Sequence, residues 1–397
     1  MKIVILAHPE FGGSQSMPRY AHFLSDGLQK RGHQVEIWSP QPRFFKLALH
    51  ASFRKWLGYI DQFLLFPLSV KRRLQHCTPD TLFVVADHAL GPWVGLLDNR
   101  VCVIHCHDFL AQRSALGQIP ENKIGWSGRI YQRFIRNGYR KGSHFISISN
   151  KTKFDLELFL LSAPRLSEVV YNGLNQKFTV LEAAPIRNYL GEMFDGDFSG
   201  GYVLHVGGNS FYKNRTGVIE IYDAWRSTTT RVLPLLMVGI RADDELRERY
   251  EQSPYKSDIY WLENASDEQL RMSYGGATVL LFPSLAEGFG WPIAEAMASG
   301  CPVITTGVSP MTEVGGEAAL YITRRPTDRQ QTAAWARESA LTLEKVVTLS
   351  PDDRQKLIDC SLSNAERFEP GKAIAQMEEI YNRLMNSYQQ GKSGTDK

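Results

Sequence analysis

Short runs of aliphatic and β-branched residues recur along the chain, and glycines or polar residues follow each run. After the first run, residues 2–7, Ser16 can cap a helix and Gly32 can end it. A second run at 35–38 then completes a unit of strand, helix and parallel strand. Runs that are apolar on both faces are typical of parallel strands buried between layers of helices. Further runs lie at 81–86, 101–106, 145–149 and 168–171, and then at 202–206, 232–238, 259–261, 279–282 and 302–304.

These runs form two series, and the break between them predicts two domains. With 397 residues the chain exceeds one ordinary hydrophobic core, and the segment from about 175 to 201 contains a proline and several glycines. We therefore predict two Rossmann-like, doubly wound α/β domains. The expected bounds are 1–180 for the first domain, 181–200 for an irregular linker, 201–369 for the second domain, 370–388 for a C-terminal helix and 389–397 for a polar tail without regular structure.

Composition narrows the class of protein. Hydrophobic residues make up 43% and aromatic residues 11%, as in a folded globular chain. No apolar run reaches the ~18 residues that a membrane-spanning helix needs, and residues 1–9 fit a first strand better than a secretion signal. The five cysteines are few and odd in number, which argues against a disulfide framework and for a reducing, cytoplasmic compartment.

Basic residues concentrate in the first part of the chain. Residues 1–150 contain 19 Lys and Arg against 9 Asp and Glu, a balance of +10, whereas the remainder contains 26 against 33, a balance of −7. This asymmetry indicates a polyanion or an anionic membrane near the first half, or a solvated basic face. The aromatic segment 53–67, close to the basic residues 71–73, fits a membrane-facing helix or an acceptor channel. Core helices have the same pattern, and we favour them here.

The most informative segment is 283–297, which follows an apolar run. It contains Glu287 and Glu295, with Gly288 and Gly290 in the turn between them. Glycine backbone and a helix N-terminus suit a phosphate, because N–H groups can approach it and the helix dipole favours an anion. Carboxylates repel phosphate, so the glutamates are expected to accept hydrogen bonds from ribose and sugar hydroxyls. The segment therefore predicts a nucleotide-sugar site, although two unrelated surface glutamates would show the same spacing.

Residues 283–297 resemble the Glu-x7-Glu motif of the retaining glycosyltransferases of family 4, and the similarity continues through 300–304 and 313–320. The resemblance is specific over roughly 200–325 and weaker elsewhere. It implies a GT-B fold, in which two Rossmann-like domains face each other across a cleft and the C-terminal helix returns to the first domain. It also implies retaining transfer of a hexose from a nucleotide-diphosphate sugar to a glycan, lipid-linked or other acceptor, as in bacterial polysaccharide or glycolipid synthesis.

The resemblance assigns roles to individual residues. Glu287 would contact the transferred sugar, Glu295 the ribose, and Lys213 the donor diphosphate. Gly208 stands where the family has an arginine, and Arg215 and Arg241 are the two candidates to replace that charge. The catalytic candidates are Glu287, His107 and Lys213, and the donor-binding candidates are Gly12, Gly13, Gly207, Lys213, Arg215, Gly288, Phe289, Gly290 and Glu295.

Two histidines follow predicted strands. His107, after the run at 101–106, matches a family position that faces the sugar, but a histidine at a strand end is as easily structural. His88, after the run at 81–86, is taken as structural.

The sequence also bears on cofactors and partners. It has no P-loop and no Asp-x-Asp pair after a strand, so we expect no obligatory metal and no cofactor besides the nucleotide sugar as co-substrate. The expected partners are a glycan or lipid-linked acceptor and an anionic membrane in peripheral contact, and not nucleic acid. Two alternatives stay open, a nucleotide-sugar epimerase of the same fold and a non-catalytic protein that binds sugar nucleotides.

Overall fold

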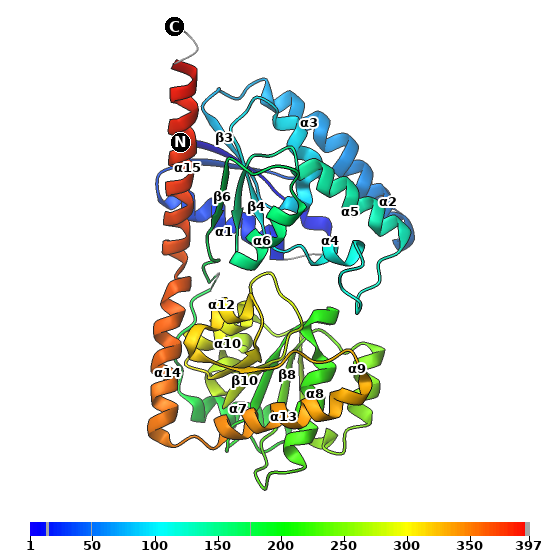
Figure 1. The fold of residues 1–397 in the computed structure, drawn as a ribbon, viewed down its shortest axis with the longest axis vertical. Coiled ribbons are helices and arrows are strands. Elements are labelled where there is room, and N and C mark those ends of the chain that lie inside the picture. The colour runs from blue at the N-terminus through cyan, green and yellow to red at the C-terminus, as the bar shows by residue number, and fades with distance from the viewer. Residues whose placement is uncertain (13–15, 49, 175, 394–397) are drawn as a thin grey trace. The chain divides into compact units, whose positions relative to one another are not determined.

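The structure, a computed structural model, describes residues 1–12, 16–48, 50–174 and 176–393 (Figure 1). The chain divides into two compact units. The first is Met1–Asn175 together with Pro370–Lys397, and the second is Gln176–Glu369. Each unit contains a six-stranded parallel sheet with helices on both faces, so the α/β class with two doubly wound sheets is confirmed.

The sheet of the first unit has the strand order β2-β1-β3-β4-β5-β6. Successive side chains point to opposite faces, so Ile3 and Leu82 belong to one core cluster and Val4 and Phe83 to another. Burial on both faces explains why the inner strands β1 and β3 are almost entirely apolar, whereas the edge strands β2 and β6 are less buried and contain polar residues. The strands are β1 Lys2–Leu6, β2 Gln34–Trp38, β3 Thr81–Val85, β4 Cys102–Cys106, β5 His144–Ser147 and β6 Leu166–Val169.

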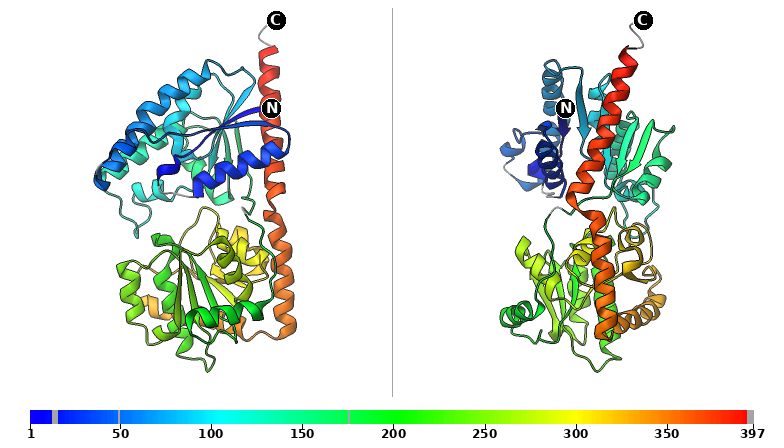
Figure 2. Two further views of the ribbon diagram at one scale, coloured as in Figure 1. Left: turned by 180° about the vertical axis from the view of Figure 1, so that it is seen from behind. Right: turned by 90° about the vertical axis from the view of Figure 1, so that its left-hand side faces the viewer.

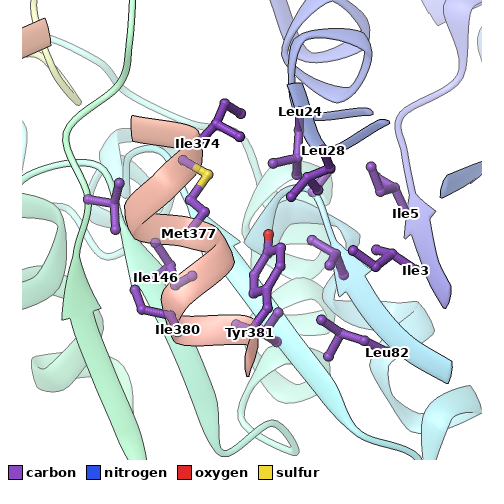
Figure 3. Close-up of a cluster of buried hydrophobic side chains, with 14 of the residues drawn as sticks. Ile3, Ile5, Leu24, Leu28, Leu82, Ile146, Ile374, Met377, Ile380 and Tyr381 are labelled. Atoms are coloured by element: carbon purple, nitrogen blue, oxygen red, sulfur yellow. The ribbon is translucent and has the colours of Figure 1, made fainter. Parts of the chain in front are cut away.

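One face of this sheet is covered by α1, Ser16–Lys30, and by the C-terminal helix α15, Pro370–Ser393. Figure 3 shows Met377 and Tyr381 of α15 beside side chains from the sheet and from α1. Between these helices lies the buried His105 of β4. The hydroxyl of Tyr20 lies 2.5 Å from its Nδ1, and the hydroxyl of Tyr381 lies 2.8 Å from its Nε2. Burial lowers the pKa of His105 to about 3, so a neutral imidazole links the first and last helices to the sheet.

Helices from the middle of the first unit cover the other face of the sheet. They bury Phe66, Val70, Ile135 and Tyr139 against it. In Figures 1 and 2, α2, α3 and α5 lie on the side of the sheet away from α15. A π-helical segment, η3, joins α2 to α3 in one continuous helical rod. The bounds are α2 Ala51–Ile60, η3 Asp61–Leu65, α3 Phe66–Leu74, α4 Leu110–Ala115, α5 Trp126–Tyr139 and α6 Asn150–Phe159.

The second unit has the strand order β12-β11-β10-β7-β8-β9. Helices α8, Arg215–Arg226, and α13, Arg329–Val347, pack on one face through residues such as Trp225 and Leu343. Helix α11, Trp291–Ala298, packs against β10, β11 and α14, Pro351–Ala365. The strands are β7 Val203–Val206, β8 Leu235–Gly239, β9 Ile259–Glu263, β10 Val279–Phe282, β11 Val303–Thr306 and β12 Ala319–Ile322.

Three elements differ from the sequence-based expectation. The segment expected to be an irregular linker contains α7, Ala183–Phe194. Pro185 lies in its first turn, where a missing N–H costs little, and Ile186 and Leu190 are buried one turn apart. Strand β12 was not predicted because only its two ends are buried. Helix α15 continues to Ser393, into the expected tail. Among helices in the described parts of the chain, none combines the length and apolarity needed to cross a bilayer.

Candidate functional site

The candidate site of the second unit lies where β7 and β10, which are neighbours in the sheet, both end. Strand β7 leads into the loop 207–214 and β10 into the loop 283–290. The amide of Asn214 donates to the carbonyl of Pro283 over 2.8 Å, and the N–H of Leu285 donates to the carbonyl of Tyr212 over 2.7 Å. Carboxyl ends of parallel strands are the usual ligand-binding edge of such sheets, and here the two loops are held together at that edge.

Lys213 and Glu287 form an ion pair in these loops. Lys213 Nζ lies 2.8 Å from Glu287 Oε1, and the hydroxyl of Ser284 donates to the same oxygen over 2.7 Å. The two charged side chains are largely buried, with 17% and 8% of their surfaces exposed. The structure thus brings together two predicted catalytic residues that are 74 positions apart in the sequence. Ser284 is a third member that the sequence did not single out.

The Lys213 ammonium keeps its charge at neutral pH. Burial acts to lower its pKa, but the carboxylate of Glu287, with smaller contributions from Tyr212 and Glu295, raises the pKa above its ordinary value. Nζ also lies 5.1 Å from the centre of the Phe282 ring, which adds a cation–π contact. A fixed positive charge in a partly desolvated loop is suited to binding a diphosphate.

Glu295 lies in α11 and is buried. Its Oε2 accepts a hydrogen bond of 2.7 Å from the hydroxyl of Tyr274, which lies in α10, Asp267–Gly276. Burial raises the pKa of Glu295 to about 7, against the opposing effects of Tyr274 and Lys213. Glu295 is therefore partly protonated at neutral pH, and a ligand hydroxyl that donates to it would favour its ionised form.

The turn between the two glutamates leads into the N-terminus of α11, where the sequence predicted the start of a helix. Gly290 caps α11 with a φ of 102°, a left-handed conformation that favours glycine. The side chain of Phe289 is buried, with its ring centre 5.5 Å from that of Trp291 and 5.4 Å from that of Phe368. A donor-binding role for Phe289, and for Gly288 beside it, would therefore have to use the backbone.

The candidate residues in and after the loop that follows β7 have different surroundings. A Cβ at Gly207 would lie 3.0 Å from His205 Nε2, so a larger residue would require the imidazole to shift by a few tenths of an ångström. A Cβ at Gly208 would meet only Ile240, at 3.8 Å. Arg215 is buried, donates to the carbonyl of Ile240 over 3.0 Å and bonds Asn209. Its guanidinium thus stabilises the loop through these contacts. Binding of the donor by Arg215 stays a prediction.

In the first unit, polar side chains meet at the carboxyl ends of β1, β3 and β4, which are adjacent in the sheet. Asp87 is buried, with His8 Nε2 2.9 Å from its Oδ2 and His88 Nδ1 2.9 Å from its Oδ1. Burial acts to raise the pKa of Asp87, but the two histidines hold it well below its ordinary value. The sequence did not single out His8 or Asp87, and His88, expected to be purely structural, belongs to this cluster.

His107, the third catalytic candidate, lies beside this cluster. Its Nε2 donates to the carbonyl of Ala86 over 2.9 Å, and the edge of its ring meets the Tyr20 ring at a centre distance of 4.4 Å. Burial lowers the pKa of His107, so the imidazole is neutral at pH 7. The bond through Nε2 fixes the tautomer and leaves Nδ1 as the nitrogen with a lone pair. Of the two predicted glycines near β1, Gly12 ends the short helix η1, Glu10–Gly12, and Gly13 lies outside the described residues.

Comparisons with known proteins agree with this architecture. Residues 200–339 match the family model described as glycosyl transferases group 1, and residues 17–178 match glycosyltransferase family 4. Among solved structures, the chain is similar to WaaG, a glycosyltransferase involved in lipopolysaccharide biosynthesis, with a TM-score of 0.68, 15% identity, and 96% of this chain and 99% of that chain covered. It is also similar to Anabaena HepE in complex with UDP and glucose, with a TM-score of 0.67, 17% identity, and coverage of 96% and 100%. The fold is GT-B, and the chain belongs to the group 1 glycosyltransferases.

Two curated relatives resemble parts of the chain. O-antigen chain mannosyltransferase B of Escherichia coli is 36% identical over 122 residues, which cover 30% of this chain and 32% of the relative. O-antigen chain mannosyltransferase RfbU of Salmonella typhimurium is 27% identical over 198 residues, which cover 49% and 51%. The chain thus spans about half or less of the length of these relatives.

Proposed function

We propose that this protein is a retaining glycosyltransferase that transfers a hexose from a nucleotide-diphosphate sugar to a growing bacterial polysaccharide. The observation that carries the proposal is the Lys213–Glu287 ion pair beside Glu295 at the ends of β7 and β10. One cation and two carboxylates at this edge suit a ligand that combines a diphosphate with hydroxyl-bearing rings. The group 1 family match over residues 200–339 includes all three.

The donor would use each of these groups differently. The diphosphate would bind Lys213 and backbone N–H groups of the turn from Gly288 to Gly290, at the N-terminus of α11. Glu295 would accept from the ribose and Glu287 from the transferred sugar. Because Glu287 Oε1 already accepts from Lys213 and Ser284, the carboxylate is better placed to orient the sugar than to attack it.

Transfer would then proceed on one face of the sugar. The bond between C1 and the diphosphate oxygen breaks, and the acceptor hydroxyl oxygen forms its bond to C1 from the same side. The acceptor proton passes to the departing phosphate oxygen. Negative charge grows on that phosphate, so the cation of Lys213 stabilises the transition state more than the ground state. His107, with a lone pair on Nδ1, would accept a hydrogen bond from a sugar hydroxyl.

The names of the relatives suggest a sugar and an acceptor. Both are O-antigen chain mannosyltransferases, which supports mannose as the hexose and a lipid-linked O-antigen-type glycan as the acceptor. We place the reaction in the cytoplasm, in peripheral contact with the membrane that holds such an acceptor. All five cysteines are free, which suits a reducing compartment.

A donor screen followed by transfer tests the proposal. The purified chain is heated with GDP-mannose, UDP-glucose and other nucleotide sugars, and we expect one of them to raise the unfolding temperature. That donor is then incubated with a lipid-linked glycan acceptor, and NMR compares the anomeric configuration of the product with that of the donor. Glu287→Gln should abolish transfer, and the exposed Glu317→Gln serves as its control. Absence of stabilisation by every sugar nucleotide would contradict donor binding, and an inverted product would contradict retention.

A further inference from the structure

The rod formed by α2, η3 and α3 in the first unit exposes an apolar stripe. Its members recur at helical spacing and leave between 53% and 64% of their surfaces open. The rod buries Phe66 and Val70 against the sheet, so the stripe belongs to a different face from the one that the core requires. The exposed members are Phe53, Trp56, Leu64 and Leu68.

Helix α5 continues this surface. Trp126, Ile130 and Phe134 are each four residues apart, and their exposed fractions range from 48% to 78%. Ring contacts join α5 to the rod, because the centres of Phe63 and Phe134 lie 5.7 Å apart and those of Tyr59 and Tyr131 also lie 5.7 Å apart. The two stripes therefore lie on helices that pack side by side, as Figure 1 shows for α2 and α5. We call these seven exposed side chains the aromatic–basic face, together with the basic residues described next.

The same helices are strongly basic. Residues 51–74 and 126–139 contain eight Lys and Arg but a single acidic residue. That residue, Asp61, is buried and accepts hydrogen bonds from the N–H groups of Phe44 and Phe45, so it does not offset the charge at the surface. Seven of these basic residues are exposed and one, Arg136, is half-buried; the exposed ones are Arg54, Lys55, Lys71, Arg72, Arg73, Arg129 and Arg133.

We propose that the aromatic–basic face docks the protein on an anionic lipid bilayer. Exposed tryptophan, phenylalanine and leucine on one side of a helix, bordered by Lys and Arg, is the arrangement by which amphipathic helices lie in a membrane interface. Lys and Arg place their aliphatic stems along apolar surface while the charged ends reach lipid phosphates. The purpose of docking rests on the proposed function, since a lipid-linked acceptor is reached from the bilayer surface.

Charge and apolarity together favour an anionic bilayer over a second copy of the chain or a nucleic acid as the partner of this face. A second copy of the chain would bring a like-charged face against this one, which costs energy in a symmetric contact. A nucleic acid would neutralise the arginines but offers no hydrocarbon for Leu64, Leu68 and Ile130. An anionic bilayer satisfies both the apolar and the basic members of the face.

Vesicle flotation without any nucleotide sugar tests the docking independently of catalysis. The full chain should float with vesicles of phosphatidylcholine and phosphatidylglycerol, and recovery should fall about tenfold with phosphatidylcholine alone, because each basic side chain near an anionic surface contributes measurably. Trp56→Ser with Trp126→Ser, and separately Lys71→Ser with Arg72→Ser, should each lower recovery at least about fivefold. All four residues are exposed, so the variants should unfold at the wild-type temperature.

Helix α13 of the second unit supplies matched controls. Leu341 is 72% exposed there, and the exposed Arg337 and Lys345 flank it by four residues on each side. Leu341→Ser and the pair Arg337→Ser with Lys345→Ser change similar surface without touching the proposed face, and both should float like wild type. Equal loss in the α13 and aromatic–basic variants, or wild type that stays unbound on anionic vesicles, would overturn the proposal.

Tryptophan quenching adds a positional readout. Lipids brominated near the headgroup end of the acyl chain should quench the emission of bound wild type, and Trp126→Phe and Trp56→Phe should each remove part of that quenching. Quenching unchanged in both variants would place another surface on the lipid and refute this face. A wild-type dimer that the Trp56→Ser, Trp126→Ser variant abolishes, without vesicle binding, would assign the face to a second copy instead. Binding to vesicles in a protein that fails to bind nucleotide sugars would refute the proposed function and leave the docking surface intact.

Discussion

In the first unit, the carboxyl ends of the strands carry histidines around Asp87, whereas in the second they carry glutamates around Lys213. Both sheets have six parallel strands with helices on both faces. Asp87 is held in its charged form by two histidines, and His107 is fixed through a backbone carbonyl. Glu295, by contrast, has a pKa near neutrality because it is buried with a tyrosine and not with a direct cation.

The comparison shows that the same edge of a parallel sheet can hold a buried carboxyl group with either a lowered or a raised pKa. Asp87, whose pKa the two histidines hold well below its ordinary value, is expected to keep its charge when a ligand arrives. A buried carboxyl that titrates near pH 7 changes its charge when a hydroxyl or a cation comes close. We therefore expect Glu295 in the second unit to change its protonation when a ligand binds, and Asp87 in the first unit to keep its own. The following predictions test that difference.

The largest expected effect is on nucleotide affinity, which a substitution in the second unit should lower and one in the first unit should not. Lys213→Ala should lower kcat/KM about 100- to 1,000-fold, because it removes a charge that stabilises the leaving group, and it should weaken nucleotide binding. His107→Ala should lower transfer while nucleotide affinity stays at the wild-type value. Calorimetric titration with nucleotide and initial-rate kinetics measure the two quantities. Similar losses of nucleotide affinity in both variants would contradict the proposal that the nucleotide is bound by the second unit.

A second prediction concerns the stability of the first unit. Asp87→Asn should cost about 1–3 kcal/mol, because the charged partner of two histidines is lost. The pKa of Asp87 is depressed, so its contribution is present above the ordinary carboxyl pKa and is lost as the pH falls through its lower value in the folded protein. Hydrogen exchange in β1 and β3 at neutral and acidic pH should show protection lost at neutral pH in the variant. Protection equal to wild type would mean that Asp87 does not stabilise this edge.

Third, donor affinity should depend on pH through Glu295. With a pKa of about 7, roughly a tenth of this carboxyl is ionised at pH 6, so affinity for a nucleotide sugar should rise up to about tenfold by pH 8. The sign for stability is opposite, because a raised carboxyl pKa makes stability fall as the pH rises from the ordinary value through about 7. Both trends should disappear in Glu295→Gln. The ligand should be a nucleotide sugar, because its diphosphate is esterified at both ends and does not change its protonation between about pH 6 and pH 8.

The smallest effect tests the position where the family has an arginine. A Cβ at Gly208 would meet only Ile240, at an ordinary contact distance. We therefore expect Gly208→Arg to fold normally. An added guanidinium beside Lys213 should tighten donor binding about fivefold, through one charged hydrogen bond to the diphosphate. The gain should shrink at high salt, and Gly208→Met provides the control for size. A gain of equal size in the methionine variant would show that charge is not the cause.

Most strands could be predicted from the sequence because they are apolar on both faces, and the two glutamates because a motif places them. The contacts of those glutamates could not. Ser284 and Tyr274 matter only because one loop and one helix bring them to Glu287 and Glu295. Likewise, His8 and Asp87 meet because β1 and β3 are neighbours, which strand order decides and local pattern does not. Helix α7 was missed because Pro185 and the nearby glycines obscured its short apolar period.

The first unit is interrupted in sequence, and this affects the order in which the chain can fold during synthesis. Residues of α15 complete the core beside Ile3, Leu24 and Leu82, yet they leave the ribosome only after the whole second unit. The second unit lies wholly between these two parts, so it can finish folding while one face of the first sheet still lacks its final helix. The link through His105 between Tyr20 and Tyr381 can form only after the second unit has been synthesised. An mRNA truncated before codon 370 would thus yield a folded second unit attached to a first unit with an open, aggregation-prone face.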